Sequence, residues 1–575
     1  MQPNKRWTVP PPHPQVHELA ARLKVSTLTA QVLLNRGISE PQQCEEFLRP
    51  SLKLLHDPAL MHGLTRAADR IARAIRDREK IVIYGDYDVD GITATSILWH
   101  AIRVLGGEAQ SYIPHRIDEG YGLNPEAINE LIDNGSQLII SVDCGVTATS
   151  SAQAAADRNV DLIITDHHEW HVENGEPVLP AAYEIVHPRL GGKYPNPHLC
   201  GAGVAFKVAW GVGQAMTGGA KVSEDFKQFL MHATALAALG TIADVVPLVG
   251  ENRVLASYGL KALPECKLLG VQALIKSSNL TGKNLDAYDV GFMLAPRLNA
   301  CGRMGHAAMA VEMLTTATAE KAVEIATYLD QQNRTRQATE KEILTEALDQ
   351  VNFNDDCRAI VLGKEGWHPG VIGIVASRIV DRFHRPTIMI ALNNGTGSGS
   401  GRSIAGFHLA NALDHCHDLL ETHGGHEMAA GLKVQTAKFQ DFRSRFCDYA
   451  KSVLTPELLL RELKLECEAP LTAITGPLVQ EMERLGPFGH GNRKPLLCVR
   501  GLQLTSVPKR VGKTGNHLQL LLKQGQSMMK AIAFNYGEMF ELLTPGKTID
   551  LAVEPTINEF NGRRSVELTV KDLQM

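Results

Sequence analysis

The sequence lacks the features that mark membrane, secreted and thiol-rich metal proteins. It contains no run of about 20 apolar residues, so no membrane-spanning helix is expected. Its first residues, MQPNKRWTVPPPHP, have no apolar core of the kind found in signal peptides. None of its 10 cysteines belongs to a C-x-x-C pair, which argues against a zinc ribbon or a redox motif. We therefore expect a cytoplasmic protein with reduced cysteines.

Basic charge and aromatic side chains are also scarce. The 58 basic and 63 acidic residues leave a net charge of −5, so any contact with a polyanion must come from local basic groups. Aromatic residues make up only 5% of the chain, which limits base stacking to a few side chains. The sequence has no Walker lysine, dinucleotide glycine fingerprint or serine elbow, so water is the best candidate for a nucleophile.

What the sequence does contain is a cluster of acids in residues 81–95, IVIYGDYDVDGITAT. Asp86, Asp88 and Asp90 are so close that their carboxylates repel one another unless they are solvated or neutralised by a cation. The pattern also begins an EF-hand loop, but the twelfth position is Ile97 instead of Glu, and a strand-like run precedes it. The stretch therefore indicates acids delivered at the carboxyl end of a strand in an α/β sheet.

Helical and strand patterns alternate from about residue 61 to 250. Strands are expected at 81–84, 109–113, 137–142, 161–165 and 183–186, with helices between most of them. This alternation is typical of a parallel, doubly wound sheet.

Acids and imidazoles follow three of these strands. A lone Asp at a strand end is more often a helix cap or a turn residue. Several carboxylates and imidazoles together at one edge of a parallel sheet would supply the oxygen and nitrogen ligands that suit Mn²⁺ or Mg²⁺. Two such ions would activate water for phosphoester hydrolysis. The candidates at these strand ends are Asp86, Asp88, Asp90, Asp143, Asp166, His167 and His168, and Asp244 joins them from the end of an apolar helical stretch.

The remaining chain divides by pattern. Residues 319–351 read as one helix of about 50 Å at about 1.5 Å per residue, with a polar middle suited to bridging two domains. A second α/β segment follows, and the last stretch has five strand signals, a short helix and an Asn561-Gly562 hairpin turn, which predict an OB-like β-barrel. The tail around NKRW is expected to be a mobile arm. We predict a multidomain α/β protein with parts at 1–60, 61–318, 319–351, 352–457 and 458–575.

Several strings resemble a known family. GDYDVDGITA, VDCG, TDHH and GTIADVVPL resemble the four motifs of the DHH phosphoesterase superfamily. RLNACGRMG, GSGRSIAGFHL and GGHEMAAG resemble the RecJ family of single-strand-specific DNA exonucleases within it. The resemblance covers about residues 60–575. It implies a DHH catalytic domain at 61–318, a DHH-associated substrate-binding domain at 352–457 and a nucleic-acid-binding domain at 458–575.

The resemblance also implies roles for individual residues. Asp143 would bridge two metal ions, His168 would face the scissile phosphate, and Asp166 would orient its neighbours. Asp86 would either be a further metal ligand or contact the ligands without binding metal itself. The implied metal ligands are Asp88, Asp90, Asp143, His167 and Asp244, with Asp86 ranked lower. The implied substrate contacts are Arg297, Asn299, Arg303, Arg402, Ser403, His408 and His426.

By resemblance, the protein is expected to hydrolyse single-stranded DNA in the 5′ to 3′ direction to nucleotide 5′-monophosphates, in repair and recombination. Single-strand-binding protein and a repair helicase are the implied partners, and we expect a monomer. The alternatives are a DHH phosphodiesterase for short oligonucleotides or cyclic dinucleotides, a pyrophosphatase of the same superfamily, and a non-catalytic single-strand-binding scaffold. The predicted C-terminal barrel argues against the small-substrate enzymes, and the intact acids argue against the scaffold.

Overall fold

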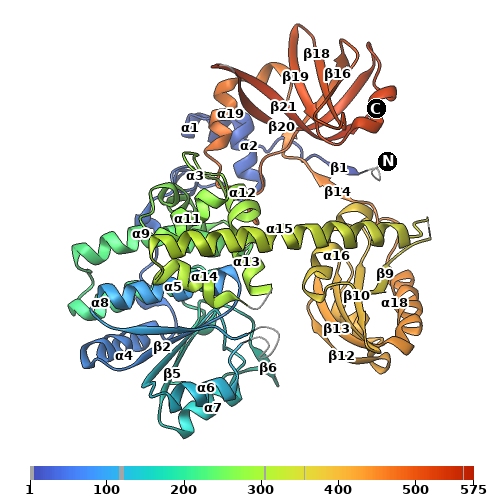
Figure 1. The fold of residues 1–575 in the computed structure, drawn as a ribbon. Helices are drawn as coiled ribbons and strands as arrows, with labels where there is room; N and C mark the ends of the chain where they lie inside the picture. The colour runs from blue at the N-terminus through green and yellow to red at the C-terminus, as the bar shows by residue number, and fades with distance from the viewer. Residues whose placement is uncertain (1–4, 116–121, 304–305, 355, 561) are drawn as a thin grey trace. The chain divides into compact units, whose positions relative to one another are not determined.

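The computed structural model describes residues 5–115, 122–303, 306–354, 356–560 and 562–575 (Figure 1). The chain forms two compact units. Unit 1 comprises Met1–Ser39, Arg334–Met482 and Pro495–Met575, and unit 2 comprises Glu40–Asn333 and Glu483–Lys494. The long helix α15 (Ala319–Gln350) agrees with the helix predicted at 319–351 and runs from one unit into the other.

Unit 2 contains the predicted parallel sheet. Its five strands lie in the order β3-β2-β4-β5-β8, and every neighbouring pair is parallel. Chain order reverses between β2 and β4, and the crevice beyond the carboxyl ends of such strands is where open α/β sheets bind ligands. The strands are β2 (Ile81–Gly85), β3 (Ala109–Tyr112), β4 (Leu138–Val142), β5 (Asp161–Thr165) and β8 (Glu184–Val186).

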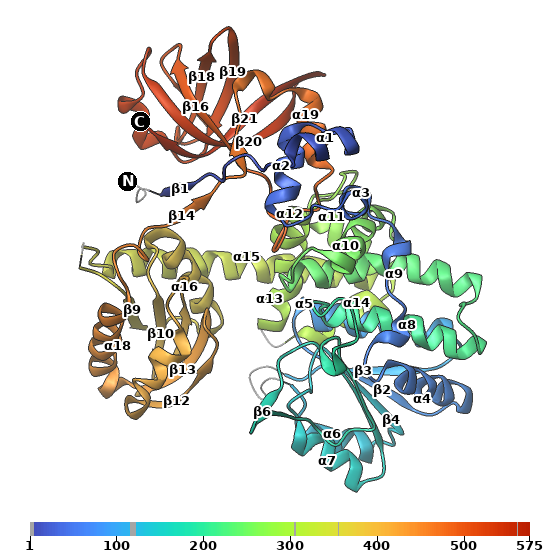
Figure 2. The ribbon, with the colours of Figure 1, turned by 180° about the vertical axis from the view of Figure 1, so that it is seen from behind.

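Helices cover both faces of this sheet, as Figure 2 shows for α4 on one side and α6 and α7 on the other. Alternate residues of each strand belong to the hydrophobic cores on opposite faces of the sheet. Ile83 and Ile140 pack with α4, α5, α8 and α9, whereas Tyr84 and Ile139 pack with α6 and α7. This alternation follows from the two-residue period of a strand. The helices are α4 (Leu64–Asp77), α5 (Val89–Val104), α6 (Pro125–Asp133), α7 (Thr149–Asp157), α8 (Gly201–Thr217) and α9 (Glu224–Ala243).

The rest of unit 2 is largely helical. A short antiparallel hairpin, β6 with β7, follows β5 and was not expected from the sequence. The further elements are α3 (Pro41–Leu48), β6 (His171–Glu173), β7 (Glu176–Val178), α10 (Gly250–Ala262), α11 (Leu269–Ser277), α12 (Ala287–Asp289), the π-helical turn η5 (Val290–Leu294), α13 (Ala295–Arg303) and α14 (Ala307–Thr315).

Unit 1 contains a mixed five-stranded sheet in the order β12-β13-β11-β10-β9. The glycine-rich run after β10 could be read as a linker, but it forms strand β11, which pairs with both β10 and β13. The elements are β9 (Ile360–Glu365), α16 (Pro369–Phe383), β10 (Thr387–Asn393), β11 (Thr396–Arg402), α17 (Leu409–Asp414), β12 (Leu420–Gly425), β13 (Ala429–Gln435) and α18 (Phe439–Val453).

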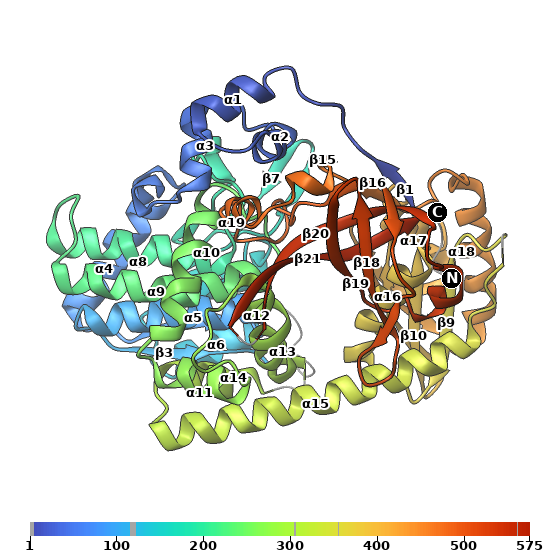
Figure 3. The same cartoon turned by 90° about the horizontal axis from the view of Figure 1, so that it is seen from above.

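The C-terminal part of unit 1 is the predicted β-rich domain (Figure 3). Strands β16, β20, β21, β19 and β18 pair in that order, and β16 also pairs with β18, which closes the ring of pairings. Asn561 of the predicted hairpin lies outside the described residues, but β20 and β21 on either side of it pair antiparallel. The elements are β15 (Cys467–Glu468), α19 (Gly476–Glu483), β16 (Leu497–Leu504), β17 (Lys509–Val511), β18 (His517–Gln524), β19 (Ser527–Ala533), β20 (Thr548–Phe560) and β21 (Arg563–Gln574).

The prediction of a mobile N-terminal arm is wrong for the described residues from Lys5 onward. Strand β1 (Arg6–Thr8) pairs in parallel with β14 (Glu462–Lys464). The indole Nε1 of Trp7 donates to Asp572 Oδ2 at 2.7 Å, and its ring packs against the core around Leu465. Backbone pairing and the packing of a half-buried aromatic ring outweigh the flexibility that the neighbouring prolines suggested. Helices α1 (Val16–Leu23) and α2 (Thr27–Asn35) follow.

Within the described part of the chain, no helix combines the length and the apolar character that crossing a membrane would require.

Candidate metal centre

The first acids of the site lie where β2 passes into α5. Asp88 is the N-cap of α5, and its Oδ1 accepts from the backbone N–H of Asp90 at 2.9 Å and of Gly91 at 3.1 Å. A Cβ on Gly91 would lie 2.6 Å from the carbonyl oxygen of Asp86, so the tight turn requires glycine. Asp88 therefore does serve as a helix cap, the common role of an Asp that follows a strand, and this cap fixes the orientation of the turn that carries the acids.

Asp90 is held by the N-terminus of α8. Its Oδ2 accepts from the N–H of Gly201 at 2.5 Å and its Oδ1 from the N–H of Ala202 at 2.8 Å. A Cβ on Gly201 would lie 2.5 Å from both Cβ and Oδ1 of Asp143, so this glycine lets α8 contact two acids at once. Burial, with a contribution from the Asp88 charge, raises the pKa of Asp90, although His167 opposes the shift.

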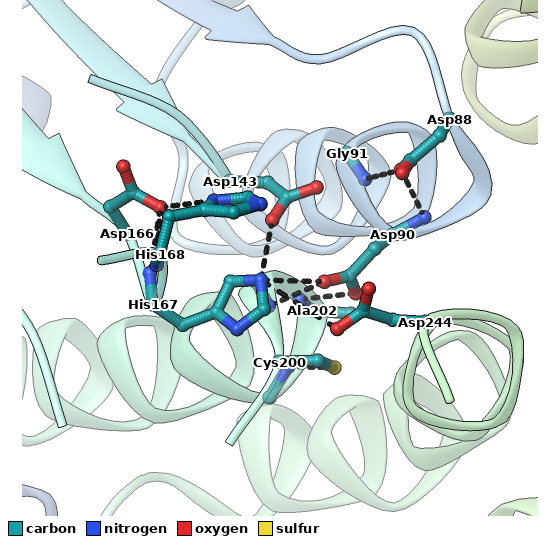
Figure 4. A network of polar contacts seen from close by, with 12 residues as sticks. Asp88, Asp90, Gly91, Asp143, Asp166, His167, His168, Cys200, Ala202 and Asp244 are labelled. Carbon is teal, nitrogen blue, oxygen red and sulfur yellow. Dashed lines mark hydrogen bonds and ion pairs between the residues drawn. The ribbon is translucent and has the colours of Figure 1, made fainter. Parts of the chain in front are cut away.

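Asp143 follows β4 and lies at the middle of the cluster (Figure 4). Its backbone has φ 63°, a left-handed conformation that Asp tolerates better than most residues. Its side chain is buried, and burial followed by the charges of the neighbouring aspartates raises the pKa of Asp143 well above its usual range. A buried carboxylate among other carboxylates calls for a compensating positive charge.

His167 points its Nε2 into the same space. This atom lies 3.2 Å from Asp143 Oδ1, 3.6 Å from Asp244 Oδ2 and 3.8 Å from Asp90 Oδ2 (Figure 4). Burial lowers the pKa of His167 to about 4, so the imidazole is neutral near pH 7 and can act as a ligand. Among the described residues, neither His167 Nε2 nor Asp143 Oδ1 has a hydrogen-bond partner despite being buried.

Asp244 completes the cluster from the C-terminal end of α9. Burial, followed by the charges of Asp90 and Asp88, raises the pKa of Asp244 to about 8. Raised carboxylate pKa values, a neutral imidazole and two buried polar atoms without hydrogen-bond partners fit a cation held by these residues.

The donor atoms fall into three overlapping groups. In each group the atoms lie within 4.8 Å of one another, and both Asp143 and His167 belong to two groups. A shared Asp143 suits a carboxylate that joins two neighbouring cations. The groups are Asp143 with His167 and His168, Asp90 with His167 and Asp244, and Asp86 with Asp88 and Asp143.

Asp166 and His168 form a pair beside this cluster. Asp166 Oδ1 contacts His168 Nδ1 at 2.8 Å, and its Oδ2 accepts from the N–H of Val146 at 2.9 Å. Burial would raise the pKa of Asp166, but these bonds lower it to about 2. Burial would likewise lower the pKa of His168, but Asp166 raises it to about 9, so the imidazole is charged near neutral pH. The His168 side chain is 43% exposed, so its cation is open to a ligand.

Two residues that the sequence reasoning missed support these histidines. His187 Nε2 contacts the carbonyl oxygen of His168 at 2.9 Å, and Arg189 Nη2 donates to the carbonyl oxygen of His167 at 2.9 Å. Both follow β8, at the same edge of the sheet as the acids. Their position after the last predicted strand was the signal that could have pointed to them.

The predicted substrate residues of unit 2 are largely engaged within the protein. Arg297 is buried, and its Nη2 lies 2.8 Å from Asp330 Oδ1. Asn299 Oδ1 accepts from the N–H of Val89 at 3.2 Å, which ties α13 to the turn that carries Asp88. The side chain of Arg303 lies outside the described residues.

The predicted substrate residues of unit 1 fall into two classes. His408 and His426 are exposed. Arg402 Nη1 donates to Ser400 Oγ at 3.1 Å and to the carbonyl oxygen of Gly401 at 2.7 Å. Ser403 is buried, and its hydroxyl donates to the carbonyl oxygen of Phe407 at 2.6 Å.

Three family models match the chain: the DHH family N-terminal domain at residues 80–240, the DHHA1 domain at 356–452 and the RecJ OB domain at 465–572. Among curated proteins, the single-stranded-DNA-specific exonuclease RecJ of Bacillus subtilis (strain 168) is 39% identical over 572 residues, covering 99% of this chain and 70% of that protein. RecJ of Dickeya dadantii (strain 3937) is 35% identical, covering 95% of this chain and 96% of that protein.

Among solved structures, RecJ from Thermus thermophilus in complex with Mn²⁺ superposes with a TM-score of 0.83 at 32% identity, covering 99% of this chain and 79% of that one. Its Mg²⁺ complex gives a TM-score of 0.78 at 31% identity, with 99% and 78% coverage. With more than 30% identity over most of the length of these relatives, the chain belongs to the RecJ family.

Proposed function

We propose that this protein is a metal-dependent exonuclease. It hydrolyses single-stranded DNA in the 5′ to 3′ direction to nucleotide 5′-monophosphates, in DNA repair and recombination. The observation that carries the proposal is the buried cluster of carboxylates around His167, because bound cations would neutralise such a cluster and would also suit phosphoester hydrolysis. The names of the relatives support the substrate and the reaction class.

The proposed metal ligands are Asp88, Asp90, Asp143, His167 and Asp244, with Asp86 as a further ligand beside Asp88. Oxygen ligands with an imidazole suit Mn²⁺ or Mg²⁺, and the solved relatives bound these two ions. Bound there, such ions would lower the pKa of a water molecule and neutralise charge on the phosphodiester. Gly201 and Ala202 hold Asp90 in place, and Asn299 holds the turn that bears Asp88.

We propose that His168 stabilises the charge of the scissile phosphate or protonates the leaving oxygen. Its imidazolium is 43% exposed and is kept charged by Asp166, which fits either role. Asp166 acts through His168 and through the Val146 N–H, so it positions these groups without contacting substrate.

Further contacts to DNA are proposed on unit 1. His408 and His426 are exposed, and Arg402 is half-buried at the end of β11, so all three remain proposed contacts. Ser403 is buried and bonded to Phe407, which makes it a positioning residue. In unit 2, Arg297 is held in an ion pair with Asp330, so we propose that it too is a positioning residue. Arg303 remains a proposed contact to DNA. The β-rich domain carries exposed basic groups at Lys509, Arg510, Lys513, Arg563 and Arg564.

We also propose that the protein works in the cytoplasm as a monomer, alongside single-strand-binding protein and a repair helicase. All 10 cysteines are free, which suits a reducing compartment. One chain supplies every proposed ligand, so the centre requires no second copy.

The test is digestion of single-stranded oligonucleotides labelled at the 5′ or the 3′ end, with Mn²⁺, with Mg²⁺ and with EDTA. We expect immediate release of the 5′ label as a mononucleotide, which is lost in EDTA and in Asp143→Ala. Release from the 3′ end alone would contradict the direction. Cleavage restricted to di- and trinucleotides would support the small-substrate phosphodiesterase, and binding without cleavage would support the scaffold.

A further inference from the structure

Two aromatic side chains of unit 2 stack on each other in solvent. Tyr288 is 63% exposed and Phe292 is 62% exposed. Their ring centroids lie 4.6 Å apart and their planes differ by 24°. Single exposed apolar residues are ordinary, but two large rings stacked face to face outside the core are uncommon in a chain with 5% aromatic residues.

The backbone explains why both rings point outward. Tyr288 belongs to α12, and Phe292 to the π-helical turn η5 that joins α12 to α13. Val290 and Leu294 of the same turn are fully buried, so this element presents one face to the core and the aromatic pair to solvent. Single π-helical turns inside helices occur frequently at functional sites.

The same helical run leads to the metal centre. Near the aromatic pair, an added Cβ on Gly291 would lie 3.9 Å from Ile242, two residues before Asp244. Further along, Asn299 accepts from the N–H of Val89 beside Asp88. At about 1.5 Å per residue, Asn299 is about 10 Å along the helix from Phe292 and about 16 Å from Tyr288. With about 3.4 Å per stacked nucleotide, this span corresponds to roughly three to five nucleotides.

We propose that Tyr288 and Phe292 form a stacking platform for bases of the single-stranded substrate, within about five nucleotides of the scissile phosphate. The outer face of a stacked ring pair offers a base a flat π-surface, and every base can use it, so the platform would not select sequence. The proposal rests on the function proposed above, and it adds a base-dependent contact to a centre that otherwise acts on phosphate.

A purely structural explanation competes with this one. Aromatic residues four positions apart stabilise their own helix whether or not DNA is present. That explanation predicts that replacing either ring changes stability alone, whereas a stacking platform predicts an effect that depends on the presence of a base.

The experiment compares Tyr288→Leu and Phe292→Leu with Leu269→Ala, which changes another exposed apolar residue of unit 2, 45% exposed on α11. Binding of a 12-nucleotide single strand is measured by fluorescence anisotropy in EDTA, so the result does not depend on hydrolysis. A set of strands with one abasic site at each of the first eight positions is bound in parallel. Thermal unfolding checks the fold, and hydrolysis of thymidine 5′-(p-nitrophenyl phosphate) checks the metal centre separately.

We expect Phe292→Leu and Tyr288→Leu to weaken binding of the intact strand about tenfold and Leu269→Ala to leave it unchanged. One or two abasic positions should weaken binding of the wild type by a similar factor and have no added effect in the variants. Equal affinity of variant and wild type overturns the proposal. So does a loss of the same size at every abasic position. If the wild type binds in this way but cleaves no DNA, the proposed function fails while the platform stands.

Discussion

Asp166 contacts His168, and we propose that it acts on the candidate centre through this imidazole. The pKa of His168 is raised to about 9 because the bond and charge of Asp166 outweigh burial. We expect an alkaline limb of the kcat/KM profile with Mg²⁺ at or below about pH 9, because cations bound beside the ring favour the neutral imidazole. Asp166→Asn removes the negative charge, so the imidazolium should lose its proton at lower pH and the limb should move toward the ordinary histidine pKa of about 6.5. Activity at pH 8 should then fall about tenfold or more.

The matched control is Asp157→Asn, an exposed aspartate at the C-terminal end of α7. It should leave the profile unchanged. If the alkaline limb does not move in Asp166→Asn, the reaction does not require the charged form of His168, whatever the change in kcat.

His187 makes a separate prediction for stability in acid. Burial lowers the pKa of His187 to about 4, below the unfolded value of about 6.5. As pH falls from about 6.5 to about 4, the unfolded chain takes up a proton that the folded chain excludes, so folding is destabilised by at most about 3 kcal/mol. In His187→Asn this part of the pH dependence should disappear. Urea unfolding between pH 4 and 7 measures it, and an unchanged slope in the variant would contradict the assignment.

At the scale of secondary-structure elements, the N-terminus of α8 positions two acids at once. Gly201 donates to Asp90, and the space for its Cβ is occupied by Asp143. Gly201→Ala should push these carboxylates apart. It should reduce Mn²⁺ affinity or kcat about 10- to 100-fold, as do substitutions of residues that hold metal ligands in place. Isothermal titration with Mn²⁺ and steady-state kinetics measure both quantities.

Gly203→Ala on the same helix is the control, because the atoms nearest to its added Cβ belong to the side chain of Leu199, at 2.9 to 3.6 Å, and not to an acid. It should lower stability without changing Mn²⁺ affinity. Equal effects of the two substitutions on metal binding would mean that α8 contributes packing alone.

The elements that were predicted correctly carry a local signal. Strand β2 and its neighbours are rich in β-branched residues, and parallel strands end at one edge of a sheet, so the sequence alone predicts that Asp88, Asp143 and His167 lie together. Helix α15 was predicted nearly to the residue because residues 319–350 contain no glycine or proline and are rich in alanine, glutamate, glutamine and leucine, which favour helices.

The elements that were missed depend on residues far away in the chain. The glycines of β11 reflect close packing: a Cβ on Gly399 would lie 2.7 Å from Leu432 of β13, 33 positions later in the chain. Gly201 touches Asp90 across 111 positions. The N-terminal strand pairs with β14 more than 450 positions later. No periodicity within one stretch reports such contacts.

At the scale of the whole molecule, metal binding, protonation and folding are linked. Without cations, burial raises the pKa of Asp90 and Asp143, and raises that of Asp244 to about 8. A cation must therefore displace protons, since its ligands are deprotonated. The apparent Mn²⁺ dissociation constant should fall as pH rises from 7 to 8.5, by up to about tenfold per pH unit for each proton released. Isothermal titration in buffers of different ionisation enthalpy gives the number of protons.

The stabilisation from Mn²⁺ should be confined to the unit that holds the centre. A ligand that binds only the folded state stabilises it by about 2.7 kcal/mol at 100 times its dissociation constant. Hydrogen exchange should therefore slow in β2, β4 and the first turn of α8 when Mn²⁺ is added, because these elements carry or hold the acids. The sheet of β10 and β11 in unit 1 contributes no proposed ligand and should exchange at its original rate. Asp143→Asn should abolish the protection in unit 2. Protection of both units by Mn²⁺ alone would mean that the metal centre is coupled to unit 1 before DNA binds.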